Sequence, residues 1–339
     1  MKASIKDVAL RSGVSVSTVS RTLSKPNLVL PETRDTVLAA ARALDYHASR
    51  SAASLKSGQT MRIALLSGSA ASTWFNANAF AGLDSVLHDA GYDTSIFTMA
   101  NVEKRREFFD QMPVLRNADA VVVNSFDIDS REAVRLKAVN VPIIGLNVPS
   151  NVGFDAAVSI DDRRALRMAV DHLAAIGHRR IAYVYTKADD STGMRFSAET
   201  RLQGFMQACA THEGKRPEQI AIDTDADAVN AVLGYLDATA PAPTALCLQS
   251  DGIALPVLFR LRQYGRDIPR DLSVIGFDDV PLAKAVGLTT LGQDPYALGR
   301  AAAVRTLAAI NGTPHEPRFA TQPVRLMLRE TTAVPHTGR

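Results

Sequence analysis

Between residues 61 and 291 the chain alternates short apolar runs with segments of helical spacing, and this alternation limits the fold more than any other feature. The runs are rich in β-branched residues and include DAVVVNS, VPIIGLN, RRIAYVY and LSVIGFDD. Continuously apolar strands that alternate with helices are typical of a parallel sheet covered on both faces. Because the series restarts after Asp161, we predict an α/β body of two doubly wound parallel-sheet subdomains. A ligand cleft is expected between them, at the carboxyl ends of the strands.

The end of the chain is expected to be shared between the two subdomains. The predicted N-subdomain covers about 61–160 and 292–321, and the predicted C-subdomain covers about 161–291 and 322–332. The remaining segments are a head at 1–47, a hinge and linker at 48–60, and a tail at 333–339.

The head at 1–47 has the pattern of three short helices. The run SIKDVALRSG has apolar residues at helical spacing, Ser4 and Asp7 resemble a capping box, and Gly13 fits a helix stop. Pro31, at a first helical position, opens a third helix. Two helices joined by a tight turn and followed by a third predict a helix-turn-helix unit.

The second helix lies within GVSVSTVSRTLS at residues 13–24, which is rich in hydroxyl and β-branched side chains that favour helices poorly. Ser15 can cap it, and Val16, Val19 and Leu23 would mark one inward face that compensates for the weak propensity by packing. A helix that reads a major groove needs outward residues near its N-terminus and hydroxyls that can bond phosphates. The segment therefore favours a DNA-reading helix over an ordinary small helical bundle.

Charge is distributed unevenly along the chain. Residues 1–60 contain nine Lys and Arg residues against four Asp and Glu residues, whereas the whole chain has a formal net charge of only +3. A basic head on a mildly acidic body favours a polyanion as the partner of the head. A solvated basic surface is the alternative.

Several motifs together identify a resemblance to a known family. The run IKDVALRSGVSVSTVSRTLS at 5–24 is followed by PETRDTVLAAARALDY and SAASLKSG, and the body contains IGHRRIAYV, SDGIA, IPRDLSVIGFDD and PVRLMLRETT. This pattern resembles the LacI family of bacterial repressors over essentially residues 4–332. The resemblance implies an all-α three-helix head, a hinge helix and a body similar to periplasmic sugar-binding proteins.

The resemblance also implies roles for residues of the head. Val16, Ser17 and Arg21 match the family's base-reading positions, and Arg21 suits a guanine, whose O6 and N7 accept a bidentate pair. Contacts with the DNA backbone are implied for Ser4, Ser15, Ser20 and Asn27.

In the hinge, Leu55 matches the family's wedge residue, which enters the minor groove and kinks the duplex, and Ala52 belongs to the same minor-groove segment. The family usually has proline where Ala48 stands and arginine where Ala53 stands. These departures imply that the backbone leading into the hinge helix is less constrained and that the helix lacks one minor-groove contact.

A sugar site needs aromatic faces for stacking and polar groups that form several hydrogen bonds. Trp74 and Phe75 follow the first strand, Asp161 ends the fifth, and Asp278 follows VIGF, all at the predicted cleft. The resemblance implies ligand contacts from these residues and from Arg195, Ser197, Arg201, Ser250 and Gln293. Each has a structural alternative, since aspartate at a strand end is often a helix cap and arginine at a helix start is usually solvated.

Other functional classes receive less support from the sequence. Cys209 and Cys247 are too few for a disulfide framework and lack metal-ligand spacing. No apolar run approaches the roughly 20 residues of a bilayer span, and the N-terminus lacks the apolar region of a secretory signal. We therefore expect no cofactor, no metal, no membrane association and a cytoplasmic, nucleoid-associated location. Two carboxylates in a cleft would also suit a glycosidase, but without a hydrolase motif no catalytic residue is assigned.

The sequence thus predicts a transcriptional regulator, a repressor, that binds a near-palindromic operator as a homodimer. A small ligand, a sugar, would control DNA binding by changing the spacing of the paired hinges. The tail after Arg329 has no heptad, so a tetramerising coiled coil is not expected. The alternatives are a sugar-binding receptor without a transcriptional role and, third, a sugar-processing enzyme. Nucleobase and nucleoside effectors stay open, as does the choice between inducer and corepressor.

Overall fold

The structure is a computed structural model that describes residues 3–24, 26–46, 59–99, 101–115, 117–188, 194–212, 214 and 216–336. The chain divides into two compact units, Met1–Met61 and Arg62–Arg339. The predicted hinge residues Ala52 and Leu55 lie outside the described residues. Within the described ranges, no helix is both long enough and apolar enough to cross a membrane.

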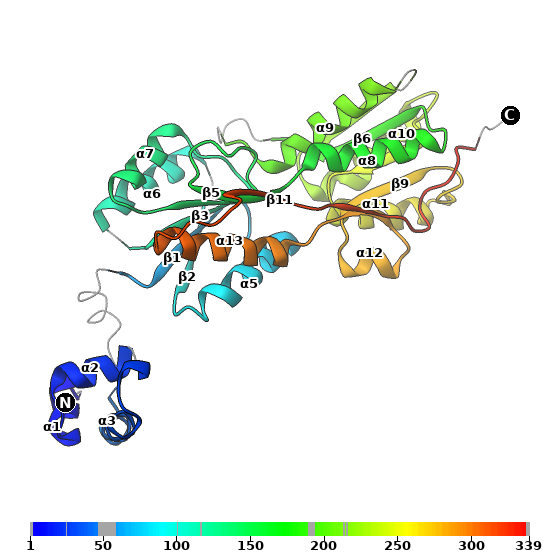
Figure 1. Ribbon diagram of the computed structural model, residues 1–339. Coiled ribbons are helices and arrows are strands. Elements are labelled where there is room, and N and C mark those ends of the chain that lie inside the picture. The colour runs from blue at the N-terminus through cyan, green and yellow to red at the C-terminus, as the bar shows by residue number, and fades with distance from the viewer. Residues whose placement is uncertain are drawn as a thin grey trace. The chain divides into compact units, whose positions relative to one another are not determined.

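The first unit is helical, as the sequence predicts (Figure 1). Its elements are α1 (Ile5–Ser12), α2 (Val16–Ser24), the 3-10 turn η1 (Pro26–Leu28) and α3 (Pro31–Ala43). A small apolar core joins the three α-helices, and it consists of Val8, Ala9, Val19, Val37, Ala40 and Ala41.

Hydrogen bonds at the helix ends stabilise this small unit. The backbone N–H and the hydroxyl of Ser4 both donate to the Asp7 carboxylate at 2.8 Å, and Gly13 ends α1 with a φ of 70°. The Ser15 hydroxyl accepts a hydrogen bond from the backbone N–H of Thr18 at 3.2 Å. Side-chain caps of this kind typically contribute about 1 kcal/mol each. The predicted capping residues of α1 and α2 are confirmed.

The inward face of α2 differs from the prediction at one position. Val19 is fully buried and Leu23 packs against the core, but Val16 is 42% exposed. Thr22 is buried in its place, and its hydroxyl donates to the Thr18 carbonyl at 2.9 Å. Helical side chains tilt toward the N-terminus, so the side chain of Val16, the first residue of α2, projects beyond the packed face.

The second unit is an α/β body with two six-stranded sheets, which confirms the predicted fold class. The strand orders are β11-β5-β4-β3-β1-β2 and β12-β10-β9-β8-β6-β7, and the two orders correspond strand for strand. In the described residues, the paired strands of these sheets run parallel apart from the antiparallel pair of β10 and β12. The two sheets are therefore the two similar subdomains that the repeated alternation indicates.

The first sheet contains β1 (Arg62–Ser67), β2 (Asp93–Thr98), β3 (Ala120–Asn124), β4 (Ile143–Leu146), β5 (Ala156–Ile160) and β11 (Phe319–Gln322). The helices α6 (Val102–Leu115) and α7 (Ser130–Ala138) cover one face, and α5 (Trp74–Leu87) and α13 (Pro295–Ile310) cover the other (Figure 1). All five residues of β3 are buried, as expected for an apolar strand that is covered on both faces.

The second sheet contains β6 (Arg180–Thr186), β7 (Arg216–Ile222), β8 (Ala245–Leu248), β9 (Ser273–Asp278), β10 (Thr289–Gly292) and β12 (Arg325–Met327). Its other elements are α8 (Asp162–Ala175), α9 (Ser197–Thr211), η3 (Asp225–Asp227), α10 (Ala228–Ala238), α11 (Asp251–Gln263) and α12 (Pro281–Ala285). The helices α10, α11 and α12 share one core with the strands, and α8 packs against α9.

The chain passes between the two sheets at three points: after β5, after β10 and between β11 and β12. Helix α13 therefore returns to the first sheet, where it packs closely against α5. The close approach depends on Gly82 and Gly299, because a Cβ at either position would overlap backbone atoms of the opposite helix. The packing of α13 against α5 therefore holds α13 on the first subdomain.

Candidate functional site

The outward face of α2 is the candidate DNA-contacting surface. The three predicted base-reading residues, Val16, Ser17 and Arg21, are all exposed. Ser17 and Arg21 lie on the side of the helix opposite the fully buried Val19. In the part of the chain that the structure describes, no carboxylate pairs with Arg21, so its guanidinium can donate to another molecule.

The predicted backbone-contacting residues lie near this face but differ in their partners. Ser4 already donates to Asp7, and the Ser15 hydroxyl lies 2.7 Å from the Ser17 hydroxyl. Ser20 is half-buried, and Asn27 is exposed on η1. A phosphate contact by Ser4 or Ser15 would therefore share a hydroxyl that also stabilises a helix end.

The candidate effector site lies at the carboxyl edges of the two sheets. Four non-glycine residues there have positive φ angles: Ser125 after β3 (69°), Asn147 after β4 (51°), Asp278 at the end of β9 (120°) and Asp279 after it (60°). Such conformations cost energy for non-glycine residues and are concentrated at functional sites and tight turns. Their position agrees with the edge at which open α/β sheets bind ligands.

The first sheet contributes neutral polar groups at this edge. Asn124 Nδ2 donates to Asn76 Oδ1 at 2.9 Å, and Asn76 Nδ2 donates to the hydroxyl of Ser69 at 2.9 Å and to the backbone carbonyl of Ala70 at 2.8 Å. A pocket of about 160 Å³ lies here, lined by Leu65, Ser67, Ala71, Asn76, Ala77, Phe80, Ile96 and Asn124. Its lining comes from β1, from the start of α5 and the loop before it, and from one residue each of β2 and β3, so it adjoins the point between β1 and β3 where the strand order reverses.

The second sheet contributes a buried ion pair at its edge. Arg201 is 6% exposed, and its Nε donates to Asp162 Oδ1 at 2.8 Å and its Nη1 to the Gln249 carbonyl at 2.7 Å. The guanidinium also lies over the Phe277 ring, 3.6 Å from the centroid. Burial opposes the charge of Arg201, but the carboxylates of Asp162 and Asp278 outweigh burial and raise the pKa of its guanidinium.

Asp278 and Gln293 form a second buried polar group beside Arg201. Gln293 Nε2 donates to Asp278 Oδ1 at 2.7 Å, and Gln293 Oε1 is buried and has no hydrogen-bond partner among the described residues. Burial raises the pKa of Asp278 to about 7, against the lowering effects of Arg201 and of the hydrogen bond from Gln293. An unpartnered oxygen beside a buried carboxyl can accept hydrogen bonds from ligand hydroxyl groups.

Four other predicted ligand residues lie at the starts of helices. Trp74 and Phe75 are the first residues of α5 and are half-buried. Asp161 is exposed and caps α8, and Ser250 caps α11 through the backbone N–H of Ile253 at 3.3 Å. The structure thus shows the capping role of Asp161 and Ser250, and their ligand contacts stay a prediction.

Arg195 and Ser197 join the two subdomains directly. The guanidinium of Arg195 pairs with Asp127 at 2.8 Å. The backbone N–H of Ser197 donates to the Ser125 carbonyl at 2.9 Å, and its hydroxyl lies 3.5 Å from the Asn147 amide. These contacts connect the loop before α9 to the carboxyl ends of β3 and β4.

Sequence reasoning missed Asp162, Asn76 and Asn124. Asp162 directly follows the predicted Asp161. Asp161 caps α8, whereas Asp162 accepts a hydrogen bond from Arg201. Asn124 ends the apolar run AVVVN, so a search for polar residues at the ends of buried strands would have found it. Asn76 had no comparable signal. Within the described ranges, no group of His, Cys, Asp and Glu residues could hold a metal ion.

Two family models match the chain. Residues 4–49 match the model described as bacterial regulatory proteins, lacI family, and residues 170–332 match the periplasmic binding protein-like domain. The transcriptional repressor PurR of Escherichia coli O1:K1 / APEC is 30% identical over 338 residues, which cover 98% of this chain and 97% of that protein. PurR of Photobacterium profundum is 29% identical over 337 residues, with coverage of 97% and 98%.

Solved structures of similar proteins agree with the fold. The lac repressor dimer bound to operator and the anti-inducer ONPF has a TM-score of 0.82 at 24% identity, and the match covers 98% of this chain and all of the other. A complex of the transcriptional regulator CelR with cellobiose has a TM-score of 0.66 at 26% identity, with coverage of 97% and 99%.

Proposed function

The chain belongs to the LacI family of bacterial regulatory proteins, and from this premise we propose that it represses transcription by binding an operator under the control of a small ligand. Proteins of this kind are regulators and not enzymes. The observation that carries the proposal is the exposed face of α2, where Ser17 and Arg21 lie opposite the buried Val19.

The head is proposed to read DNA through α2 in a major groove. Arg21 would form a bidentate pair with a guanine, and Val16 and Ser17 would contact neighbouring bases. Ser4, Ser15, Ser20 and Asn27 would position the helix through the DNA backbone. The excess of basic residues in the first 60 residues supports contact with a polyanion.

A homodimer on a near-palindromic operator is the proposed assembly. Exposed apolar side chains on the body, Phe259, Tyr264 and Leu282, offer surface that a second copy could cover. Pairing of two copies would bring two hinges together, so that Leu55 and Ala52 of each could enter the minor groove. We place this complex at the nucleoid, in the cytoplasm.

The proposed effector is a sugar bound at the carboxyl edges of the two sheets. Sugar hydroxyls can donate to Gln293 Oε1 and to the Asp278 carboxyl, and the aromatic side chains at the start of α5 could stack on a sugar ring. The similarity to a regulator solved with cellobiose supports this ligand class. The proposed contacts are Trp74, Phe75, Asp161, Arg195, Ser197, Arg201, Ser250, Asp278 and Gln293.

Control of DNA binding would follow from movement of one subdomain against the other. Arg195 and Ser197 already connect the subdomains, so a ligand that strengthens or breaks these contacts would change the spacing of the paired hinges. A typical coupling of about 1–3 kcal/mol would alter operator affinity about 5–150-fold.

Fluorescence anisotropy on labelled DNA from upstream of the protein's own gene tests this proposal at fixed salt, since affinity depends steeply on ionic strength. Arg21→Ala should lose roughly 1–3 kcal/mol and relax base preference at one position in each half-site. Arg11→Ala, an exposed change on α1, is the matched control. Equal losses on all DNA would instead make Arg21 a phosphate contact.

A panel of sugars and nucleosides in the same assay tests the effector. Loss of specific binding on adding one compound would identify an inducer, and tighter binding would identify a corepressor. The absence of specific binding with every compound would favour the second candidate, a sugar-binding receptor without a transcriptional role.

A further inference from the structure

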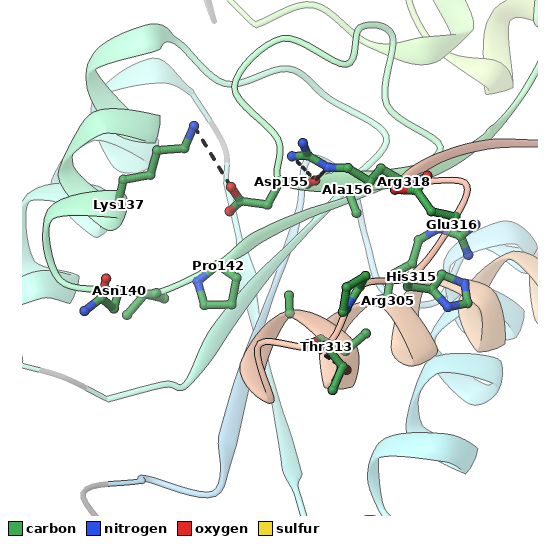
Figure 2. Close-up of a pocket in the computed structure, with 14 residues that line it drawn as sticks. Lys137, Asn140, Pro142, Asp155, Ala156, Arg305, Thr313, His315, Glu316 and Arg318 are labelled. Atoms are coloured by element: carbon green, nitrogen blue, oxygen red, sulfur yellow. Dashed lines mark hydrogen bonds and ion pairs between the residues drawn. The ribbon is translucent and has the colours of Figure 1, made fainter.

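A larger pocket, of about 450 Å³, lies at the amino edge of the first sheet, opposite the candidate effector site. Its lining comes from the turn between α7 and β4, from the start of β5, and from the end of α13 with the loop that follows (Figure 2). The charged lining residues are Lys137, Asp155, Arg305, Glu316 and Arg318, with His315 beside them. The proposed function makes no use of this pocket.

Arg305 contributes a buried positive charge to the lining of the pocket. It is 6% exposed, and its guanidinium donates to two backbone carbonyl oxygens, those of Ala301 and Pro317, both at 3.0 Å. Its Nε is buried without a hydrogen-bond partner, and among the residues that the structure describes no carboxylate forms an ion pair with it. Desolvation alone lowers the pKa of Arg305. Buried charges ordinarily have an opposite charge as partner, so this site lacks one.

The other charged groups of the pocket are already engaged or remain at its rim. Lys137 Nζ lies 4.0 Å from the carboxylate of Asp155, and Arg318 donates to the backbone carbonyl of Asp155 at 2.9 and 2.6 Å. Glu316 is exposed and accepts from the backbone N–H of Arg318 at 3.3 Å. The pocket lining therefore has three permanent cations against two carboxylates, and His315 adds a further cation when protonated.

The C-terminal end of α13 would by itself disfavour an anion, because its last carbonyl oxygens carry partial negative charge. Two of them have partners, however. The Ala308 carbonyl accepts from the backbone N–H and the hydroxyl of Thr313 at 2.9 and 3.2 Å, and the Ala309 carbonyl accepts from Gly312 at 3.3 Å. The helix end is thus capped by its own loop, whereas the Nε of Arg305 is left without a partner.

We propose that this pocket binds a small metabolite through a carboxylate or phosphate group, with the buried Arg305 as its anchor and with Lys137 and Arg318 at its rim. A guanidinium offers planar N–H donors that match both kinds of oxyanion. The volume falls within the roughly 300–1,000 Å³ of small-molecule sites, which leaves room for more than a bare ion. A ligand there would tie the loop after α13 to the turn before β4. The site is separate from the effector site and does not depend on it.

Isothermal titration of the full chain with inorganic phosphate and, separately, with citrate tests the proposal, with chloride holding the ionic strength constant. Saturable binding of at least one probe is expected, and the arm that binds identifies the class of oxyanion. Arg305→Met should weaken that binding about tenfold or more through loss of charge-assisted hydrogen bonds. Arg300→Met is the matched control, because Arg300 is exposed on the same helix and donates to Ser85. It should keep the wild-type affinity.

Urea unfolding in chloride buffer provides a second readout. Arg305→Met should be at least as stable as the wild type, because an uncompensated buried charge is replaced by an apolar side chain. A marked loss of stability would mean that the two hydrogen bonds to the carbonyls of Ala301 and Pro317 outweigh the cost of the buried charge, and would overturn the proposal. So would the absence of saturable binding for both probes, or equal binding by Arg305→Met. If that variant does not fold, Arg305→Lys replaces it, and an unchanged affinity in Arg305→Lys would exclude Arg305 as the anchor.

Discussion

The two subdomains share one strand order but present different chemistry at their carboxyl edges. The first offers amides and hydroxyls, where Asn124 donates to Asn76 and Asn76 donates onward to its own loop. The second offers charges, where Arg201 is held between Asp162 and the Phe277 ring. The amide network is closed by its own hydrogen bonds, whereas the charged edge includes an unpartnered buried oxygen. The first subdomain therefore contributes neutral hydrogen-bonding groups to the site, and the second contributes charged ones.

This difference has energetic consequences. Breaking a buried ion pair by removing one partner leaves an uncompensated charge, which costs more than losing a neutral hydrogen bond. The charged edge should therefore dominate the stability of the body and its dependence on pH, and the amide edge should respond more weakly. Among the contacts between the edges, the ion pair of the exposed Arg195 with Asp127 should have the smallest effect on unfolding.

Removal of Asp162 is expected to have the largest effect. Asp162→Ala leaves the buried guanidinium of Arg201 without its carboxylate and should lower the free energy of unfolding by about 3–5 kcal/mol. Urea denaturation measures the change. The exposed neighbour Asp161 is the matched control, since Asp161→Ala removes only a helix cap, at about 0.5–2 kcal/mol. The double variant Asp162→Ala/Arg201→Met should recover much of the lost stability. Equal losses in Asp162→Ala and Asp161→Ala would show that the buried ion pair contributes no more than a helix cap.

Asp278 should make stability depend on pH. Its pKa in the folded protein is about 7, above the roughly 3.9 of an unfolded chain, so the folded protein holds a proton that unfolding releases. Relative to Asp278→Asn, the wild type should therefore lose stability as pH rises from about 5 to 7, by at most about 1.4 kcal/mol per pH unit, and change little above that range. Urea unfolding at several pH values measures the slope. If the wild type instead gains stability relative to Asp278→Asn as pH rises, the raised pKa of Asp278 is wrong.

The amide edge should respond less strongly. Asn124→Ala removes the donor to the buried side-chain Oδ1 of Asn76 and should cost about 1–3 kcal/mol of unfolding free energy. Its effect should be nearly independent of pH between 5 and 8, because no titrating group takes part. Asn151→Ala, at an exposed position, serves as the control in the same denaturation series. A pH-dependent loss at Asn124 would show that the two edges are electrostatically coupled.

Much of the fold could be predicted from the sequence because its signals are local. The run AVVVN of β3 is apolar at four of five positions and is buried throughout, as expected for a strand covered on both faces. The caps at Ser4 and Ser15 depend on residues only three positions away. Apolar spacing places Val16 on the inward face, because such spacing does not show where the packed part of a helix begins, whereas the family resemblance implies an outward position for Val16.

The site was less accessible to sequence reasoning because its partners are distant in the chain. Helical phase decides which of the adjacent Asp161 and Asp162 faces inward, and a strand end alone does not fix that phase. The bond between Asn76 and Asn124 joins residues 48 positions apart, on different elements. Arg305 lies in an ordinary helical run, and only the fold shows that it is buried with no counter-charge in the ranges that the structure describes.

The contact between the two edges should have the smallest effect on unfolding. The Arg195 side chain is 72% exposed in its ion pair with Asp127, so Arg195→Ala should change the free energy of unfolding by no more than about 1 kcal/mol. Lys187→Ala breaks a similarly exposed pair with Asp223 within the second subdomain and is the matched control. Because Arg195, unlike Lys187, bridges the subdomains, its loss should change effector affinity while Lys187→Ala leaves it unaltered. Identical effector titrations for the two variants would show that this bridge plays no part in bringing the two edges together.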